Sequence, residues 1–376
     1  MNDRPKHNSL QDVLIVGGGV IGLSLARELA GQGRRVTVVE RGCFGQEASW
    51  AGAGILPAAR LHAADPPLNQ LAGLSMQMHA AWACELQEET GIDTGFRTPG
   101  ELFVAYTAEE VDQLRHWTEN WKASALNPRL LATTELEEFE AAVAPDAVQL
   151  AVFLPRSGQL RNPRHLSALV ASCQHRGVKL LSGCEVLDFD IRGDRIHAAI
   201  ADQGRFIAEQ FCLASGAWTG RLGRRFGLNL TVHPIRGQIA LLRQPCETFA
   251  RVINQGLCYL VPRRDGRVLA GATMEDAGFH KQTTAGGIAG LLELAQRLVP
   301  SLAGAELEQS WAGLRPATAD GVPYLGQLPL IENAFVAAGH FRSGLHLSTG
   351  TARVLAQQMS QAATTVPLDA FRVDRH

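Results

Sequence analysis

The sequence lacks a large excess of charge of either sign. Its 376 residues include 35 Lys and Arg against 37 Asp and Glu, a formal net charge of −2. This balance provides no field that would attract a polyanion, so nucleic acid is not expected as a partner. No apolar run reaches the roughly 18 residues of a membrane-crossing helix, and the polar start from Met1 to Gln11 does not fit a signal peptide. We therefore expect a cytoplasmic protein that does not bind a membrane.

Cysteine is sparse and scattered. The 7 cysteines include no C-x-x-C pair and no His-Cys cluster with the spacing of a zinc site. The pattern fits a reducing compartment and predicts no metal site. With 46% hydrophobic and 19% charged residues, the chain has the composition of a globular protein, and its length suits two domains or one domain with a large insertion.

The N-terminal region has the pattern of a βαβ unit. A short apolar run, Val13 to Val16, stops at three glycines, as expected of a strand buried on both faces of a parallel sheet. Apolar residues then recur at helical spacing from Val20 to Ala30. A second apolar run, Val36 to Val39, ends at Glu40. This order predicts strand, helix and strand.

The first turn of this unit, Gly17-Gly18-Gly19-Val20-Ile21-Gly22, matches G-x-G-x-x-G. Gly17 permits the tight turn, Gly19 lets the backbone approach a pyrophosphate, and Gly22 lets the helix pack on the strand. The helix N-terminus favours the anion, and Glu40 is placed to accept both ribose hydroxyls, which disfavours NADP. The combination predicts dinucleotide binding rather than a mere tight turn.

The residues after the second strand favour FAD over NAD. Glu40-Arg41-Gly42 is followed by Ser49-Trp50-Ala51-Gly52-Ala53-Gly54-Ile55, whose small residues would let the backbone pass beside a flat ring system or a pyrophosphate. Taken by itself, this stretch fits an ordinary flexible loop nearly as well.

Later segments predict a second sheet. Strands are expected at 232–242, 250–261 and 267–272, which would form an antiparallel substrate platform, whereas Phe211 to Ala214 resembles a central strand of the nucleotide-binding sheet. Helices are expected at 68–90, 108–124, 162–176, 287–299 and 350–362. We predict an α/β fold with an α+β insert, in which a Rossmann-like FAD-binding domain (residues 1–83, 155–230 and 321–376) interleaves with an antiparallel-sheet substrate domain (84–154 and 231–320).

Two further stretches carry candidate functional residues. Gly339-His340-Phe341-Arg342-Ser343-Gly344 follows an apolar strand, where open parallel sheets bind ligands. His340 and His346 are candidate general bases, but we interpret them as core or loop histidines because the sequence assigns them no partner. Arg315 lies among Trp, Leu and Pro, so its charge requires an anion. A substrate carboxylate would match the guanidinium fork; an internal salt bridge is the alternative.

These residues together resemble the D-amino-acid-oxidase-like flavoproteins, and within them the glycine oxidase branch. The resemblance spans nearly the whole chain. Besides the glycine turn and Glu40, it rests on the strings Cys258-Tyr259-Leu260-Val261-Pro262-Arg263, Gly271-Ala272-Thr273-Met274, Trp311 to Pro316, Gly339 to Gly344, and the ending Phe371 to Arg375.

The resemblance implies a non-covalently bound FAD and a carboxylate clamp of Arg315 and Tyr259, with Arg342 near the flavin edge. Ile55, Asn254, Leu257 and Met274 would line the substrate pocket, although a Tyr or Met on a strand is often simply core. The implied FAD contacts are Gly17, Gly19, Val20, Ile21, Gly22, Glu40, Arg41, Ala48, Ser49, Ala53, Gly54, Ile55, Val186, Gly339, His340, Phe341, Arg342, Ser343, Gly344, Leu345 and His346.

The chain departs from its branch at the amine side of the implied pocket. Where a relative has a histidine before the Cys-Tyr pair, this chain has Leu257; Ile55 replaces a methionine and Asn254 a tyrosine. In the related sarcosine oxidases the flavin is tethered to a C-terminal cysteine, but no cysteine follows Cys258 here. A tether in that part of the chain is therefore excluded.

The resemblance implies oxidation of glycine, an N-alkylglycine or a small D-amino acid by hydride transfer from Cα to flavin N5. The products would be a 2-oxo acid, ammonia or an amine, and hydrogen peroxide from dioxygen. It also implies a homo-oligomer and a role in thiamine biosynthesis. Two alternatives stay open: a D-amino-acid dehydrogenase that passes electrons to a quinone, and a non-catalytic flavin-binding subunit.

Overall fold

The computed structural model describes residues 11–228 and 230–375. The polar N-terminal segment discussed above lies, apart from Gln11, outside the described residues. Within the described part of the chain, no helix is both long and apolar enough to cross a membrane.

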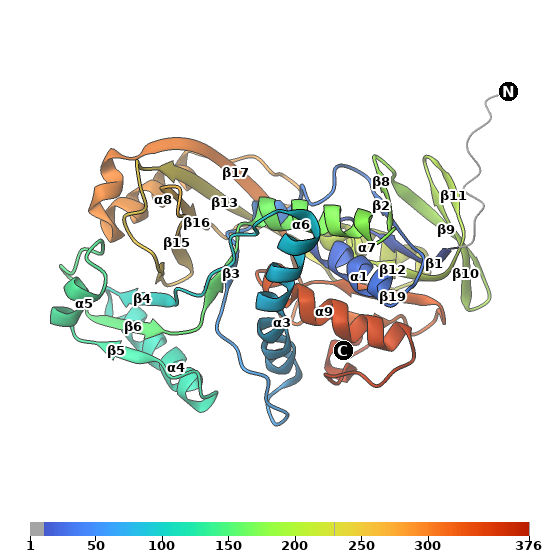
Figure 1. Ribbon diagram of the computed structural model, residues 1–376, viewed down its shortest axis with the longest axis horizontal. Coiled ribbons are helices and arrows are strands. Elements are labelled where there is room, and N and C mark those ends of the chain that lie inside the picture. The colour runs from blue at the N-terminus through green and yellow to red at the C-terminus, as the bar shows by residue number, and fades with distance from the viewer. Residues whose placement is uncertain (1–10, 229, 376) are drawn as a thin grey trace.

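The nucleotide-binding half is a six-stranded sheet, shown on the right of Figure 1. Five neighbouring strands run parallel and one edge strand is antiparallel. The strands are short apolar runs, which suits burial on both faces. In spatial order they are β18 (Tyr324–Gln327), β19 (Ala334–Ala338), β12 (Ala208–Leu213), β1 (Gln11–Val16), β2 (Val36–Glu40) and β8 (Lys179–Ser182).

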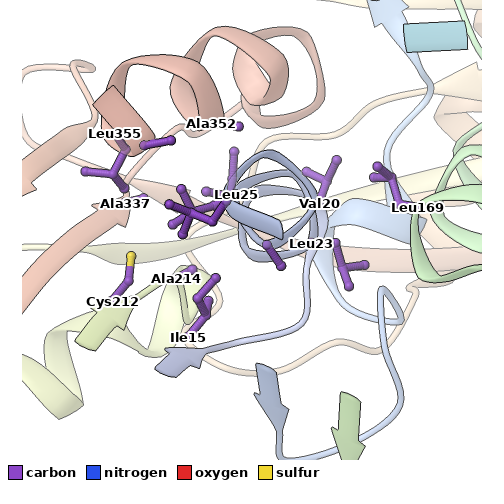
Figure 2. Packing of buried hydrophobic residues seen from close by; sticks show 14 of the residues in the cluster. Ile15, Val20, Leu23, Leu25, Leu169, Cys212, Ala214, Ala337, Ala352 and Leu355 are labelled. Atoms are coloured by element: carbon purple, nitrogen blue, oxygen red, sulfur yellow. The ribbon is translucent and has the colours of Figure 1, made fainter. Parts of the chain in front are cut away.

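Helices cover one face of this sheet and a small antiparallel sheet covers the other. In Figure 2, Leu25 of α1 (Val20–Gly31) lies between Ile15 and Cys212 of the sheet and Leu355 of α9. Phe189 and Ile196 of the small sheet pack on the opposite face. The further elements are α3 (Pro67–Thr90), α6 (Asn162–His175) and α9 (Gly344–Met359) on the helical side, and β9 (Val186–Arg192), β10 (Arg195–Ala201) and β11 (Gly204–Phe206) on the other.

The second half is an eight-stranded sheet, on the left of Figure 1. Its neighbours are antiparallel except β14 and β4, which run parallel. In spatial order the strands are β17 (Glu306–Ala317), β13 (His233–Arg243), β16 (Arg267–Gly271), β15 (Cys258–Pro262), β14 (Val252–Gln255), β4 (Glu101–Ala105), β6 (Leu150–Leu154) and β5 (Arg129–Leu131).

Two helices pack on opposite faces of this second sheet. Leu291 and Leu298 of α8 (Ala285–Leu298) join the core on one face. Val111 and Leu114 of α4 (Ala108–Ala123) pack with Val152 on the other face. Short elements complete the chain: α2 (Ala48–Ala51), β3 (Ile55–Leu56), α5 (Thr133–Phe139), β7 (Gly158–Gln159), α7 (Thr219–Gly223) and four 3-10 turns among the described residues (η1 Gly216–Trp218, η2 Arg224–Phe226, η3 Pro300–Gly304, η4 Asp369–Phe371).

The predicted fold class is confirmed, since a parallel nucleotide-binding sheet is interleaved with an antiparallel sheet. All strands of the first sheet fall within the ranges predicted for the FAD-binding domain, and all strands of the second within those predicted for the substrate domain. The predicted boundary between 83 and 84, however, falls inside α3, which continues to Thr90 and packs along α9.

Two element predictions were wrong in detail, and one long strand was missed. The strand predicted at 250–261 is the hairpin of β14 and β15, which turns at Gly256 with φ +54°. The last helix begins at Gly344 instead of Gly350, because Gly350 lies inside α9 at its close contact with α3, where a Cβ would come within 2.4 Å of Ser75 Oγ. The 12-residue strand β17 was not predicted, since Glu306 and Glu308 break its apolar pattern.

Candidate functional site

A cavity of about 670 Å³ lies where the two sheets meet. Its wall runs from the glycine turn after β1, past the loop at 47–58, to the face of the second sheet that carries Tyr259 and Arg315. Almost all predicted cofactor and substrate residues line it, although they come from distant parts of the chain. The carboxyl ends of β1, β2 and β19 open into the cavity, which is where open parallel sheets bind their ligands.

The glycine turn has the geometry that its sequence predicts. Gly17 has φ +115°, and a Cβ there would lie 2.4 Å from the carbonyl oxygen of Ala214 on the neighbouring strand. A Cβ on Gly22 would lie 2.0 Å from the carbonyl oxygen of Gly17, so only glycine lets α1 approach the turn. Gly22 therefore packs helix on strand and does not line the cavity, whereas Gly17, Gly19, Val20 and Ile21 do.

Glu40 ends β2 at the cavity wall. Its Oε2 accepts a hydrogen bond of 2.8 Å from Gly18 N, and its Oε1 accepts one of 2.9 Å from Gly42 N. Each carboxylate oxygen keeps a second lone pair for a ribose hydroxyl. The neighbouring Arg41 pairs with Glu47 and lies over the ring of Trp218, 3.7 Å from its centroid.

The loop of small residues is held in place by side chains from elsewhere. Ser49 Oγ accepts a hydrogen bond of 2.9 Å from Val20 N at the start of α1. Gly54 has φ +77°, and a Cβ there would meet the carbonyl oxygen of Leu160 at 2.0 Å. Ala48, Ser49, Ala53, Gly54 and Ile55 all line the cavity, as does Val186 at the start of β9. The alternative of an unconstrained loop does not fit these contacts.

The segment between β19 and α9 forms another wall. Residues His340, Phe341, Arg342, Ser343, Gly344, Leu345 and His346 line the cavity. Gly339 does not: it has φ +81°, and a Cβ there would lie 2.4 Å from Thr318 Cγ2. Its role is to allow the turn out of β19.

His340 and His346 are buried, which suits core histidines. His340 Nε2 lies 3.1 Å from Thr351 Oγ1, and the carbonyl oxygen of His346 lies 2.8 Å from His79 Nε2. Burial lowers the pKa of His340 and of His346 to about 3. Both rings are therefore neutral at physiological pH and poor proton acceptors.

Arg315 and Tyr259 meet on the cavity wall that the second sheet forms. The Arg315 guanidinium lies flat over Gly237, whose added Cβ would be 2.2 Å from Nη2, and donates a hydrogen bond of 3.0 Å to the carbonyl oxygen of Thr273. Burial lowers the pKa of Arg315, and the neighbouring Tyr259 opposes this shift. Burial raises the pKa of Tyr259, against the attraction of Arg315 and Arg342. Tyr259 is thus a neutral phenol beside a guanidinium.

Arg315 has no ion-pair partner within 4.0 Å among residues 11–228 and 230–375. The internal salt bridge that the sequence left open is therefore not formed there. A partly buried guanidinium without a carboxylate can bind an incoming anion, since its charge is already partly desolvated.

The remaining predicted pocket residues divide into two groups. Ile55, Asn254 and Leu257 line the cavity, and Arg342 donates a hydrogen bond of 3.0 Å to the carbonyl oxygen of Leu257 at the hairpin turn. The prediction for Met274 was wrong: its side chain is 53% exposed and does not line this cavity. It lies beyond the strand end at Gly271, next to Glu275, whose backbone pairs with Arg236 of β13.

Sequence reasoning missed several residues of the cavity wall. Glu101, Phe103, Trp117 and Trp121 lie on β4 and α4 and line the cavity next to Asn254. The four-residue spacing of the two tryptophans indicated a shared helical face, but the sequence did not tell which partner that face meets. An acid at the start of an otherwise apolar strand was the signal for Glu101.

Comparison with known proteins agrees with this geometry. The family model described as FAD dependent oxidoreductase matches residues 12–358. The chain is 40% identical over 97% of its length to the glycine oxidase of Geobacillus kaustophilus, covering 97% of that protein. It is 34% identical over 97% of its length to the bifunctional protein ThiO/ThiG of Synechocystis sp., of which it spans 54%.

The chain belongs to the FAD dependent oxidoreductase family. Its structure matches the crystal structure of the Geobacillus kaustophilus glycine oxidase with a TM-score of 0.93 at 38% identity, covering 97% of this chain and 99% of that one. Both the resemblance and the FAD cofactor predicted from the sequence are thereby confirmed.

The cavity fits the cofactor of this family. Gly17 and Gly19 add no side chain of their own at the α1 N-terminus, where only the small Ser49 hydroxyl accepts from Val20 N, so a pyrophosphate can approach the backbone there. Glu40 lies where a ribose would be held, and the small residues from Ala48 to Gly54 leave room for a flat ring. No group of three or more His, Cys, Asp or Glu side chains that could hold a metal ion occurs in the described part of the chain.

Proposed function

We propose that this protein is an FAD-dependent oxidase that deaminates glycine or another small amino acid, such as an N-alkylglycine or a small D-amino acid. The products are a 2-oxo acid, ammonia or an amine, and hydrogen peroxide. The activity of its relatives supports this assignment, since the chain covers 97% of the glycine oxidase to which it is 40% identical.

One observation carries the proposal: the Arg315 guanidinium faces the cavity and pairs with no carboxylate among the described residues. Its hydrogen bond to Thr273 uses Nη1, so other N–H groups remain to bind a substrate carboxylate. Tyr259 adds a hydroxyl donor beside it. Together they would hold the carboxylate of an amino acid and leave its Cα free to face the flavin.

The chain's own residues bind, orient and desolvate the substrate. The clamp fixes the carboxylate, and Arg342 keeps the 256–257 turn at the rim of the cavity. No side chain is needed to remove a proton from Cα, in agreement with the neutral, buried state of His340 and His346. Bound FAD would supply the acceptor for the hydride of Cα, with dioxygen as the final oxidant. The resulting imine is hydrolysed by water.

Further proposals concern the setting of the reaction. A cytoplasmic location is consistent with the absence of any spanning helix among residues 11–228 and 230–375. Similarity to a bifunctional ThiO/ThiG protein, of which the chain spans 54%, supports a role in thiamine biosynthesis. A homo-oligomer is also proposed, by analogy with the family.

The decisive experiment is an assay of purified, FAD-loaded protein in air with glycine, sarcosine and small D-amino acids. We expect bleaching of the flavin absorbance without oxygen and stoichiometric hydrogen peroxide with it. Electron transfer only to an artificial dye would instead support a D-amino-acid dehydrogenase, and a flavin that no amino acid reduces would support a non-catalytic subunit.

A further inference from the structure

The cavity extends beyond the carboxylate clamp into an aromatic compartment, formed by Phe103 of β4 and by Trp117 and Trp121 of α4. All three side chains are partly exposed and line the same cavity as Arg315 and Tyr259. The ring centroids of Phe103 and Trp121 are 4.7 Å apart, and those of Phe103 and Trp117 are 6.4 Å apart. The compartment therefore offers clustered aromatic surface to a ligand in the cavity.

Strand register places this compartment at a defined distance from the clamp. Tyr259 is opposite Asn254 in the β15–β14 pair, and Asn254 is opposite Phe103 in the β14–β4 pair. The three side chains line the cavity in a row on one face of the sheet, across two strand spacings of roughly 5 Å each. Glycine has no atom that could extend to Phe103 while its carboxylate stays on Arg315.

Asn254 supplies a polar group between the carboxylate clamp and the aromatic compartment. Its Nδ2 donates a hydrogen bond of 3.0 Å to Oε2 of the buried Glu101, which fixes the amide. Its Oδ1 has no hydrogen-bond partner within the described part of the chain. An amide oxygen accepts from the N–H of an amine. An amine held there lies between the clamp and the aromatic rings.

We propose that Phe103, Trp117 and Trp121 form a subsite for an apolar, aromatic substituent on the substrate nitrogen, and that the protein oxidises N-arylalkyl glycines. This inference rests on the proposed function and names its substrate class. Asn254 accepts the N–H of the secondary amine, and Glu101 is a positioning residue that orients Asn254. The substituent stacks on the rings, where aromatic contacts add to the burial of apolar surface.

N-benzylglycine illustrates the reaction. The Cα–H bond breaks and the hydrogen leaves with its electron pair as a hydride to the oxidised flavin, while the nitrogen lone pair closes a C=N bond to Cα and the nitrogen releases its proton to water. Water cleaves this imine to glyoxylate and benzylamine. Dioxygen takes up the two electrons with two protons and becomes hydrogen peroxide, which restores the oxidised flavin.

The test compares N-benzylglycine with sarcosine in the wild-type protein and in Trp117→Leu and Phe103→Leu variants. We expect the wild-type KM for N-benzylglycine to lie below that for sarcosine. Each variant should raise the N-benzylglycine KM roughly tenfold and change the sarcosine KM less than about twofold. Leu114→Ala is the matched control, because Leu114 is buried under the same helix but does not line the cavity.

Calorimetric binding provides a readout that does not depend on turnover. (Benzylthio)acetate and (methylthio)acetate have the shape of the two substrates without an oxidisable amine. The former should bind more tightly to wild-type protein, and Trp117→Leu should remove the difference. Equal binding of both ligands to the wild-type protein would overturn the subsite.

The outcomes separate this inference from the proposed function. If sarcosine is oxidised but N-benzylglycine is neither oxidised nor preferred, the subsite is wrong and the oxidase stands. If D-phenylalanine is the substrate whose KM depends on Trp117, the compartment holds a Cα substituent and the assignment to nitrogen is overturned. If no amino acid is oxidised, the proposed function fails, while the binding experiment still decides on the subsite.

Discussion

The guanidinium of Arg263, at the end of β15, donates a hydrogen bond of 2.7 Å to the carbonyl oxygen of Ala53 in the cofactor loop. That bond comes from Nη2, whereas Nη1 donates to the carbonyl oxygen of Leu160 and to Gln159 Oε1. Arg263 is buried, and burial lowers its pKa to about 9, which leaves the side chain charged at neutral pH. One arginine of the substrate sheet thus holds the loop that borders the flavin.

Arg263→Met should weaken both stability and cofactor retention. The substitution leaves buried carbonyl oxygens without donors, which costs roughly 2 to 4 kcal/mol of unfolding free energy. Urea unfolding and flavin retention after gel filtration measure the two effects. Arg264→Met is the control, because Arg264 is exposed. If both variants had the same free energy of unfolding, the hydrogen bonds of Arg263 would not stabilise the cofactor loop.

The clamp can be tested by displacing Arg315 as well as by removing it. Arg315→Ala should raise the KM for glycine roughly 100-fold, as expected for losing about 3 kcal/mol of binding, while FAD stays bound. Gly237→Ala should have a similar but smaller effect, since the new Cβ would lie 2.2 Å from Arg315 Nη2. Gly304→Ala is the matched control, because its Cβ would meet no other described part of the chain within 4 Å. An unchanged KM in Arg315→Ala would refute the clamp.

Buried histidines should make the fold sensitive to acid. Burial lowers the pKa of His165 to about 3, and neither of its ring nitrogens has a hydrogen-bond partner among the described residues. The folded pKa lies below the unfolded value near 6.5, so stability is full above pH 6.5 and falls as the pH decreases toward 3. Each such histidine lowers the free energy of unfolding by about 1.4 kcal/mol for every pH unit of acidification in this window.

His165→Leu should flatten this dependence. Between pH 6.5 and 5.5 the variant should lose about 1 kcal/mol less stability than wild type, and at pH 8 it should be at least as stable, because two unsatisfied nitrogens are removed. Urea unfolding at these pH values is the measurement. The paired carboxylate of Glu89 has a pKa of about 2, below its ordinary value of 4.5. Its contribution to the free energy of unfolding is therefore lost only as the pH falls from about 4.5 toward 2. If the free energy of unfolding of His165→Leu fell with decreasing pH as steeply as that of the wild type, His165 would not be the source of the acid sensitivity.

Denaturation should release all of the flavin. Cys184 lines the cavity, but burial raises its pKa to about 11, so it is a thiol and not a thiolate at neutral pH. No cysteine follows Cys258 in the sequence. We expect acid precipitation to leave a colourless pellet and a yellow supernatant. Flavin absorbance that remains with the protein would show a covalent bond.

The local parts of the site could be predicted from the sequence because neighbouring residues encode them. Gly17, Gly22 and Glu40 have roles that follow from a turn, a helix start and a strand end within one βαβ unit. The wall formed by Phe103 and Trp117 could not be predicted, because it depends on the parallel pairing of β14 with β4, 150 residues apart in the chain. Met274 was misplaced because the sequence does not show which side chains beyond the strand end at Gly271 face the cavity.

The order of strands in the nucleotide-binding sheet has a consequence for synthesis on the ribosome. β1 and β2 emerge first, but β12, the partner of β1 on its other side, emerges much later, and β19 and α9 come near the end of the chain. The glycine turn thus has one flank open until β12 has been made, and the cavity wall from His340 to His346 is added only near the end of the chain. We expect a polypeptide that stops before β19 to lack this wall of the cavity and therefore to retain flavin poorly.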